Sequence, residues 1–467
     1  MASQFDVIVL GGGPAGYVCA IRAAQLGLAT AVVEREKLGG VCVNIGCIPT
    51  KALLHSAYIA RLLKESAEFG VETGAVKTDY GVAMKRSRKV ADQNSRGVDF
   101  LMKKHKITVV KGTGVLQPGR KVKVGSDVLE ARKAVVIATG SRVKGIPQIG
   151  LEINKTTVIS SDEALVLEKL PASVAVIGAG AVGMEFASLF ARFGTAVTVI
   201  EMLPRVLPLE DEEVSAEAQK VLAKQMAIHV GAKTEAALKT EHGVEVGFRT
   251  AQGESKTVTA ELLLLAVGRG PVTDGLNLES TKAQLDRGHV RTNHLMATDE
   301  PGVFAIGDVV ALPDRPHPQL AHVASAEGIG VMERLAGKST EPVNYDQIPS
   351  ATYCRPETAG VGLTEAEARK RGHDVRVGRF PFAALAKPRI LGHTEGFVKV
   401  VSDARYDEVL GIHMVGPHVT DLVSEACLAL RLEATTEEIF RTIHPHPTLP
   451  ETLMQAAEAV YGHAIDA

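Results

Sequence analysis

Two segments of the chain repeat one pattern of apolar and glycine positions. In the first segment, the apolar residues 5–10 lead into a glycine-rich turn and a helical stretch, and a second apolar run ends at Glu34. In the second, residues 173–177 open the same order of elements, which ends at Glu201. Short apolar runs bounded by glycine are typical of buried parallel strands. The pattern therefore predicts two units, each with a strand, a glycine turn, a helix and a second strand.

The glycines of both turns have the spacing of a dinucleotide-binding motif. In the pattern G-x-G-x-x-G, the first glycine permits a tight turn, the second lets the backbone approach a pyrophosphate, and the third brings the helix against the strand. The helix N-terminus favours phosphates, and a later carboxylate accepts hydrogen bonds from a ribose hydroxyl. Both units place this acid 23 residues after the first glycine. The residues that fit are Gly11, Gly13, Gly16 and Glu34 in the first unit and Gly178, Gly180, Gly183 and Glu201 in the second.

Each unit also has a later apolar run that ends in a glycine turn. Residues 135–140 and 264–269 have this form, so we expect Gly140 and Gly268 near the edges of the two cofactor sites. A further apolar run ends at Asp308. Taken alone, that aspartate is compatible with a helix cap that faces a phosphate, a partner for a polyol hydroxyl, or an ordinary turn residue.

Composition and charge narrow the class of protein. Of the 467 residues, 45% are hydrophobic and 23% are charged, as in a soluble globular protein rather than a disordered or fibrous one. The net charge is −2, so we expect neither a nucleic-acid partner nor an anionic membrane partner. No uncharged apolar run approaches the roughly 20 residues of a membrane helix. Because an apolar strand starts at Phe5, we expect a cytoplasmic, bacterial-type protein without a signal or transit peptide.

Two of the five cysteines, Cys42 and Cys47, lie close together in a glycine-rich segment. Five cysteines are few for a secreted chain of this length, so we expect a reducing compartment. A structural zinc site normally needs a second short-spaced pair, which the sequence lacks, so we expect no metal. The glycines and the following Pro49 predict a turn that exposes both thiols. Two cysteines this close together in an exposed turn are typical of a redox-active disulfide. One dinucleotide site would then hold a flavin, the other a nicotinamide, and the cysteines would pass electrons between the flavin and a sulfur substrate.

These motifs together resemble the flavin-dependent pyridine nucleotide-disulfide oxidoreductases, from residue 5 to about residue 461. Within that family, three further segments resemble most closely the dihydrolipoamide dehydrogenase branch. The segments that carry the family resemblance are residues 11–18, 40–51, 138–140, 305–308 and 444–451, and those that favour the branch are residues 16–27, 320–322 and 415–422.

The resemblance implies a role for each matching residue. Cys42 would be the interchange thiol that meets the substrate, and Cys47 the thiol against the flavin. Glu185 would pair with Lys51 where flavin and nicotinamide meet. The general base would be His446, oriented by Glu451; an imidazole of near-neutral pKa suits removal of a proton from a dithiol. FAD would lie on Gly11, Gly13, Gly16, Glu34, Lys51, Thr139, Gly140, Asp308 and Ala321, and NAD on Gly178, Gly180, Gly183, Glu201 and Gly268.

The resemblance also implies an architecture, an activity and partners. The expected fold is α/β: two Rossmann-like dinucleotide-binding domains and a C-terminal α+β dimerisation domain. The FAD domain would take residues 1–146 and 273–345, the NAD domain residues 147–272, and the dimerisation domain residues 346–467. The expected activity is oxidation of protein-bound dihydrolipoyl groups with NAD. The chain would form a homodimer and would serve the lipoyl-bearing acyltransferase of 2-oxo acid dehydrogenase complexes, or a glycine-cleavage carrier.

Several alternatives share parts of this pattern. Glutathione reductase uses NADPH, and although Arg205 is near, the Glu201 carboxylate should repel a 2′-phosphate. Mercuric reductase needs a terminal cysteine pair, which is absent, and a soluble transhydrogenase would lack Cys42 and Cys47. A catalytically silent flavoprotein partner is the alternative from a different class. The proline-rich residues 311–319 depart from the family pattern and leave the shape of that loop open.

Overall fold

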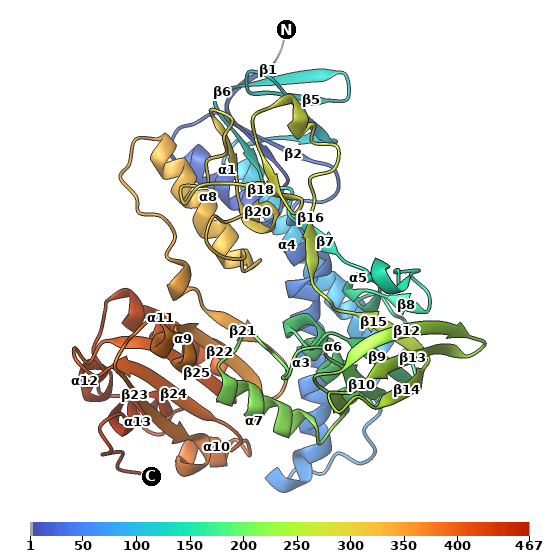
Figure 1. The fold of residues 1–467 in the computed structure, drawn as a ribbon, viewed down its shortest axis with the longest axis vertical. Coiled ribbons are helices and arrows are strands. Elements are labelled where there is room, and N and C mark those ends of the chain that lie inside the picture. Colours follow the sequence, from blue (N-terminus) through green and yellow to red (C-terminus); the bar gives the residue numbers. More distant parts are fainter. Residues whose placement is uncertain (1–2, 467) are drawn as a thin grey trace. The chain divides into compact units, whose positions relative to one another are not determined.

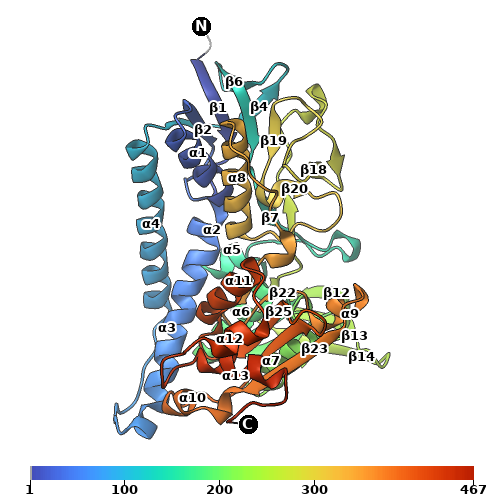
Figure 2. The same cartoon turned by 90° about the vertical axis from the view of Figure 1, so that its left-hand side faces the viewer.

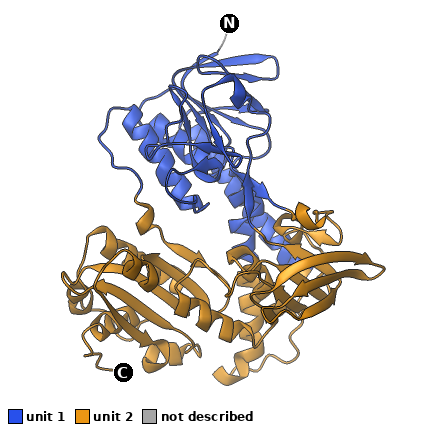
Figure 3. Ribbon diagram, in the orientation of Figure 1, with its two compact units in different colours: residues 1–53, 81–144, 268–343 blue, residues 54–80, 145–267, 344–467 orange. Residues whose placement is uncertain are grey.

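The computed structural model describes residues 3–466 of the chain, which divide into two compact units (Figure 3). Unit 1 is built from residues 1–53, 81–144 and 268–343, and unit 2 from residues 54–80, 145–267 and 344–467. The predicted NAD and dimerisation segments both fall largely in unit 2. The three predicted domain boundaries therefore stay a prediction.

Unit 1 contains a mixed sheet with the strand order β3-β2-β1-β6-β5-β4, in which β19 also pairs with β6 (Figure 1). β1 is parallel to β2 and β6, as the first repeat predicts. Its residues from Val7 to Leu10 are buried, which is the reason for their continuous apolar run. The elements of unit 1 are β1 (Ser3–Leu10), α1 (Pro14–Gln25), β2 (Thr30–Glu34), α2 (Gly40–Ile45), the start of α3 (Cys47–Glu65), most of α4 (Tyr80–Lys104), β3 (Thr108–Lys111), β4 (Gly114–Gln117), β5 (Lys121–Val124), β6 (Asp127–Ile137), β7 (Ser141–Val143), β16 (Arg269–Pro271), β17 (Leu285–Asp286), β18 (His289–Arg291), β19 (Val303–Ala305), β20 (Val310–Ala311) and α8 (Ala321–Leu335).

The helices α1 and α8 pack side by side in unit 1 (Figure 2). Their close approach is explained by a glycine, since a Cβ at Gly328 of α8 would come within 2.9 Å of the Cβ of Cys19 in α1. Cys19 is fully buried there, as expected for a thiol in the core. The pairing brings the first glycine turn and the N-terminal part of α8 into one region of the unit.

Unit 2 contains the second repeat, in a parallel sheet with the strand order β11-β10-β9-β15-β8. A small antiparallel sheet has the strand order β12-β13-β14. A larger antiparallel sheet has the strand order β21-β22-β25-β24-β23, and α11 and α13 pack against it. The elements of unit 2 are β8 (Val158–Ile159), α5 (Ser161–Ala164), β9 (Ser173–Ile177), α6 (Ala181–Phe193), β10 (Ala196–Ile200), α7 (Glu212–Leu222), β11 (Ala227–His229), β12 (Lys233–Thr240), β13 (Gly243–Arg249), β14 (Ser255–Ala260), β15 (Leu262–Leu265), β21 (Ser350–Thr352), β22 (Glu357–Gly362), α9 (Glu365–Lys370), β23 (Val375–Pro381), α10 (Ala386–Ile390), β24 (Phe397–Asp403), β25 (Val409–Gly416), α11 (Val419–Arg431), α12 (Thr436–Arg441) and α13 (Glu451–Ala459).

The large antiparallel sheet is the core of the predicted dimerisation segment. Every residue of β25 is buried, and so is every residue of β24 except Phe397. A strand buried on both faces needs cover on each side, and α11 and α13 supply part of this cover through Val423 and Ala456. No helix within residues 3–466 is both long and apolar enough to span a membrane.

Candidate active site

The first and third glycines of each motif are required by packing within the protein. Gly11 has φ +104°, and a Cβ there would lie 2.3 Å from the carbonyl oxygen of Ala138. A Cβ at Gly16 would lie 1.8 Å from the carbonyl oxygen of Gly11, a distance that no side chain permits. The second unit repeats both contacts: the corresponding distances are 2.4 Å from Gly178 to the oxygen of Ala266, and 1.9 Å from Gly183 to the oxygen of Gly178.

The middle glycines have a different explanation. A Cβ at Gly180 would meet no heavy atom within 4 Å, and one at Gly13 would meet only the Cα of Gly40, at 3.8 Å. Gly13 and Gly180 are the N-caps of α1 and α6, and neither helix has a side-chain cap. An open approach to uncapped N–H groups is what a bound pyrophosphate requires. The residues of both turns therefore fit the phosphates of a dinucleotide.

Glu34 and Glu201, the acids predicted to bind ribose, are held by backbone hydrogen bonds. Oε2 of Glu34 accepts the N–H of Gly12 at 2.7 Å, and Oε2 of Glu201 accepts the N–H of Ala179 at 2.6 Å. The second oxygen of each carboxylate accepts a further N–H two residues after the acid. Each acid is thereby fixed against its own glycine turn, and its remaining lone pairs are those available to a ribose.

Cys42 lies within the short helix α2, and Cys47 is the first residue of the longer helix α3, so neither lies in a turn. The expectation of a glycine-rich turn at this position is wrong, because α2 carries Cys42 and α3 begins at Cys47. Positive φ angles at Gly39 and Gly40 start α2, and Gly46, with φ −146° and ψ −113°, interrupts the helix between the thiols. Cys47 is exposed and Cys42 is half-buried.

The two sulfurs are in contact. A hydrogen bond to Cys47, together with burial, raises the pKa of Cys42 above the ordinary value of a thiol, and the cation of Lys51 acts in the opposite direction. Burial and the hydrogen bond between the two sulfurs therefore favour the protonated form of Cys42. Lys51 lies one helical turn after Cys47, as the sequence predicts. The pair has the proximity that formation and opening of a disulfide require.

Cys42 also lines a cavity of about 660 Å³ in unit 1. Tyr17 and Ile48 form part of its wall near the thiol, and Phe100 and Leu101 of α4 form another part. Ala321, a predicted FAD contact, lies at the first position of α8 and lines the same cavity. The walls are largely apolar, so they suit an aliphatic chain that carries sulfur to Cys42. Sequence reasoning missed the contribution of α4, because nothing local links it to the cysteines.

Asp308 belongs to a short 3₁₀ turn at the end of β19. Its Oδ2 accepts a hydrogen bond from Oγ of Ser141 at 2.5 Å, and Nε of Arg269 donates to the same hydroxyl at 2.7 Å. Ser141 directly follows Gly140, and Arg269 directly follows Gly268, so both predicted glycine turns contribute to this network. Thr139 donates to the carbonyl of Val272 at 2.6 Å and lines a second cavity with Gly11 and Glu34. Sequence reasoning missed Ser141 and Arg269.

The carboxylate of Glu185 lies in unit 2, where it accepts the backbone N–H of Tyr353 at 3.0 Å. It is 4% exposed. This contact joins α6 to the segment before β22 and was not expected from the sequence. Lys51 belongs to unit 1, so its pairing with Glu185 stays a prediction.

His446 and Glu451 form the pair that the family resemblance implies. Nδ1 of His446 lies 2.9 Å from Oε1 of Glu451, and the N–H of Thr448 donates to Oε2 at 2.6 Å. Glu451 opens α13, and its side chain is 12% exposed, whereas that of His446 is 75% exposed. The carboxylate thus fixes one ring nitrogen and leaves the other to face outward, the geometry of an oriented general base.

The neighbouring His444 forms a second, more buried pair. Its Nε2 lies 2.9 Å from Oε1 of Glu425, and its Nδ1 lies 2.7 Å from the carbonyl of Thr442. This contact could not be expected from the sequence, because Glu425 lies on α11, 19 residues before His444. Within residues 3–466 no cluster of three metal-binding side chains occurs.

Comparison with known proteins identifies the family. Residues 5–328 match the family described as pyridine nucleotide-disulphide oxidoreductase, and residues 348–457 match the dimerisation domain of the same family. The chain therefore belongs to the pyridine nucleotide-disulphide oxidoreductases. The predicted fold class and the predicted class of oxidoreductase are both confirmed.

Individual relatives agree with the predicted branch. The dihydrolipoyl dehydrogenase of Bacillus subtilis (strain 168) is 44% identical over 479 aligned positions, which cover all of both chains. The mitochondrial dihydrolipoyl dehydrogenase of Pisum sativum is 39% identical and covers 99% of this chain and 93% of its own. The resemblance to the dihydrolipoamide dehydrogenases is thereby confirmed.

Solved structures show the same fold. The crystal structure of LpdA from Mycobacterium tuberculosis has a TM-score of 0.87 at 25% identity, over 98% of this chain and 99% of that one. The HOCl-induced flavoprotein disulfide reductase RclA of Escherichia coli has a TM-score of 0.84 at 25% identity, over 97% and 99%.

Proposed function

We propose that the chain oxidises protein-bound dihydrolipoyl groups to lipoyl groups and reduces NAD, using FAD and a Cys42–Cys47 redox pair. The observation that carries this proposal is the contact between the two sulfurs beside a largely apolar cavity that Cys42 lines. A dihydrolipoyl arm is an aliphatic chain that ends in two thiols, so it matches both the cavity wall and the chemistry of the pair. The names of the relatives support the same activity.

The chain's own groups divide the chemistry between them. A substrate thiolate attacks the Cys42 sulfur of the oxidised pair, and Cys47 leaves with the electron pair. The second substrate thiol then displaces Cys42, which closes the lipoyl disulfide and leaves both cysteines reduced. His446, oriented by Glu451, takes a proton from the substrate. Overall, the dithiol loses two electrons and two protons, of which NAD takes one hydride and the solvent one proton.

The glycine turns assign the two cofactors. FAD would be held by the turn from Gly11 to Gly16, by Glu34, and by the Asp308 turn; the turn from Gly178 to Gly183 and Glu201 would hold NAD. When bound, FAD supplies a two-electron acceptor between the cysteines and the nicotinamide. Lys51 would place its cation near that acceptor.

The proposal extends to assembly and location. The match to a dimerisation domain supports a homodimer, with residues 346–467 as the interface segment. Its lipoyl substrate would be carried by the acyltransferase of a 2-oxo acid dehydrogenase complex or by a glycine-cleavage carrier. The small number of cysteines favours a reducing compartment, here the cytoplasm.

The test is an assay with free dihydrolipoamide and NAD, which follows NADH at 340 nm. Matched reactions replace these reagents with glutathione disulfide and NADPH, or with a mercuric salt and NADPH. We expect turnover only with dihydrolipoamide. Faster turnover of either alternative would contradict the proposal, and a flavin-loaded protein inactive in all three assays would favour the silent flavoprotein.

A further inference from the structure

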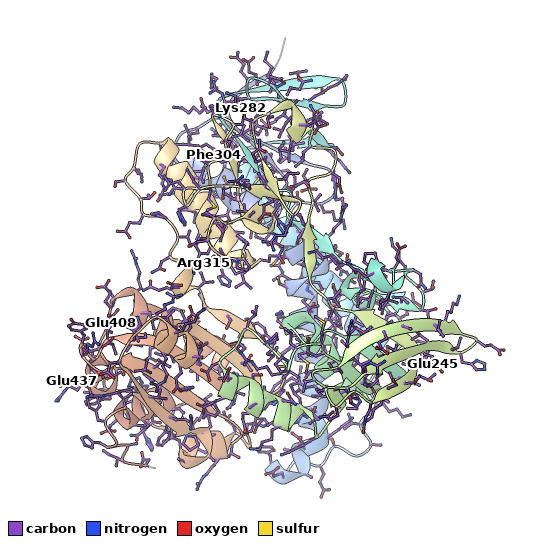
Figure 4. The ribbon with its side chains drawn as sticks, in the orientation of Figure 1. Glu245, Lys282, Phe304, Arg315, Glu408 and Glu437 are labelled. Carbon is purple, nitrogen blue, oxygen red and sulfur yellow. The ribbon has the colours of Figure 1, made fainter. Side chains whose placement is uncertain are left out.

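The proline-rich loop before α8 is closed by a buried histidine. Residues 312–320 connect β20 to α8, and Arg315, which Figure 4 labels, lies in this loop. Pro316 and Pro318 are exposed, yet the side chain of His317 between them is only 2% exposed. A polar side chain buried within an exposed loop needs partners in the protein.

Both ring nitrogens of His317 have such partners. Nε2 lies 2.9 Å from Oε1 of Glu327 in α8, and the backbone N–H of Gln319 lies 3.0 Å from Nδ1. Because a backbone N–H only donates, Nδ1 carries no proton, and Nε2 therefore carries the ring proton and donates it to Glu327. The Glu327 carboxylate is the acceptor of this hydrogen bond.

Glu327 also contacts a second segment of the chain. Its side chain is fully buried, and its other oxygen, Oε2, accepts the N–H of Gly307 at 2.7 Å. Gly307 opens the 3₁₀ turn that carries Asp308. One carboxylate thus joins the proline-rich loop to the Asp308 turn.

The Asp308 turn packs closely against the helix on each side of it. Gly307 has φ +74°, and a Cβ there would lie 3.2 Å from the Cβ atoms of both Ala15 and Ala324. The turn is therefore wedged between α1, which follows the first glycine turn, and α8. A change in the orientation of Glu327 would move the Gly307 amide, and with it the carboxylate of Asp308.

We propose that His317 is a positioning residue for FAD. By holding Glu327, it fixes the Gly307 amide and the Asp308 turn, and it ties the loop to the helix that begins at Ala321. This inference rests on the proposed FAD site in unit 1. It gives the proline-rich loop, whose shape the sequence left open, a role in holding the cofactor rather than in the chemistry.

Three substitutions of His317 separate this role from simple anchoring of the loop. In His317→Gln, the side-chain amide can reach the position of Nε2 and donate to Glu327. In His317→Asn, the shorter amide matches the position of Nδ1 and can accept from Gln319, but it cannot reach Glu327. His317→Ala removes both contacts. His294→Ala, at an exposed position of unit 1, is the matched control.

The measurement is the rate at which purified holoprotein releases FAD, followed by the recovery of free-flavin fluorescence. We expect the Ala and Asn variants to release FAD on the order of tenfold faster than the unmodified protein, the change that one hydrogen bond to a charged group supports. The Gln variant and the His294→Ala control should stay within about twofold of the unmodified protein.

Equal release rates for all variants, or a rate restored by Asn rather than Gln, would overturn the inference. If the Ala variant fails to fold, the comparison of Gln with Asn still decides. The unmodified protein separates this inference from the proposed function. If it purifies without FAD, the FAD site itself is refuted. If it binds FAD tightly and the His317 variants release FAD at the same rate, only the role of His317 is refuted.

Discussion

Glu34 and Glu201 occupy equivalent places in the two repeats: each accepts the backbone N–H of the residue 22 positions before it, at 2.7 and 2.6 Å. The glutamate that is predicted to read a ribose therefore also shapes the glycine turn that is predicted to hold the phosphates. A substitution at either position has two consequences, one for the sugar and one for the turn. Comparison of the two sites can separate them.

We predict that Glu201→Gln weakens the preference for NAD over NADP. The ionised carboxylate of Glu201 should repel the 2′-phosphate of NADP, so the unmodified enzyme should prefer NAD by on the order of a hundredfold in kcat/KM. The Gln side chain keeps the shape and one acceptor oxygen but loses the charge. The ratio of kcat/KM values should fall by about tenfold or more, mainly because activity with NADP rises.

Glu34→Gln is the matched control for this experiment. It makes the equivalent change in the first repeat, so it should loosen FAD without altering the ratio of NAD to NADP efficiency. Similar kcat/KM values of the unmodified enzyme with NAD and with NADP would show that Glu201 does not face the ribose.

We predict that Cys47→Ser abolishes turnover with dihydrolipoamide while FAD stays bound. The serine hydroxyl cannot form a disulfide with Cys42, whereas the glycine turn and the Asp308 turn are unchanged. In the unmodified protein, a thiolate next to the flavin should give a long-wavelength absorbance band after two-electron reduction, and the variant should lack this band. Cys427→Ser, which changes a half-buried cysteine of α11, should leave both readouts unchanged. Turnover in Cys47→Ser would contradict the assignment of the pair.

The repeats could be predicted closely from the sequence because their signals are local. The predicted strand 173–177 coincides with β9, and α1 follows the first glycine turn as predicted. The apolar runs, the spaced glycines and the terminal acid all lie within about 30 residues of one another, and together they indicate the same strand–turn–helix–strand unit.

The conformation of the cysteine segment could not be predicted in this way. α2 has only six residues, and it is held by contacts from α4, where Ser95 donates to the carbonyl of Leu38 and Arg88 donates to that of Asn44. Contacts between residues that are 44 to 57 positions apart leave no periodic pattern in the sequence. The same reason applies to the cavity wall from α4. The pairing of His317 with Glu327 joins residues only 10 positions apart, but it links a loop to a helix and so follows no periodic pattern either.

We predict that Glu210→Gln stabilises the protein at alkaline pH. Burial raises the pKa of Glu210 to about 7, the nearby charge of Asp211 acts in the same direction, and the hydrogen bond from Ser350 opposes them. A pKa above that of the unfolded chain means that the protonated form stabilises the fold below about pH 4.5, and that this stability is lost as the pH rises through about 7. At pH 8 the buried carboxylate should cost up to about 3 kcal/mol, which the neutral Gln side chain avoids.

Thermal unfolding from pH 4 to pH 8 checks this prediction. The unfolding midpoint of the Gln variant should match that of the unmodified protein near pH 4 and exceed it at pH 8. Glu241→Gln, at an exposed position of the same unit, should show no pH-dependent difference. A Glu210→Gln midpoint that lies below that of the unmodified protein at pH 8 would mean that the carboxylate is ionised and favourably paired.

The ring of His446 faces outward: its side chain is 75% exposed although Glu451 orients it. In a twofold dimer, a base on the interface segment can serve the cysteine pair of the partner, and the exchange is reciprocal. Cys47→Ser and His446→Gln should each be nearly inactive. In a hybrid dimer of the two variants, one active site would receive both lesions and the other neither. Random reassortment makes about half of the dimers hybrid, so about a quarter of the unmodified activity should return when the two variants are co-expressed or refolded together. Differently tagged chains would show that hybrids form, and activity that stays at the level of the parents despite abundant hybrids would place the base and the cysteine pair in the same chain.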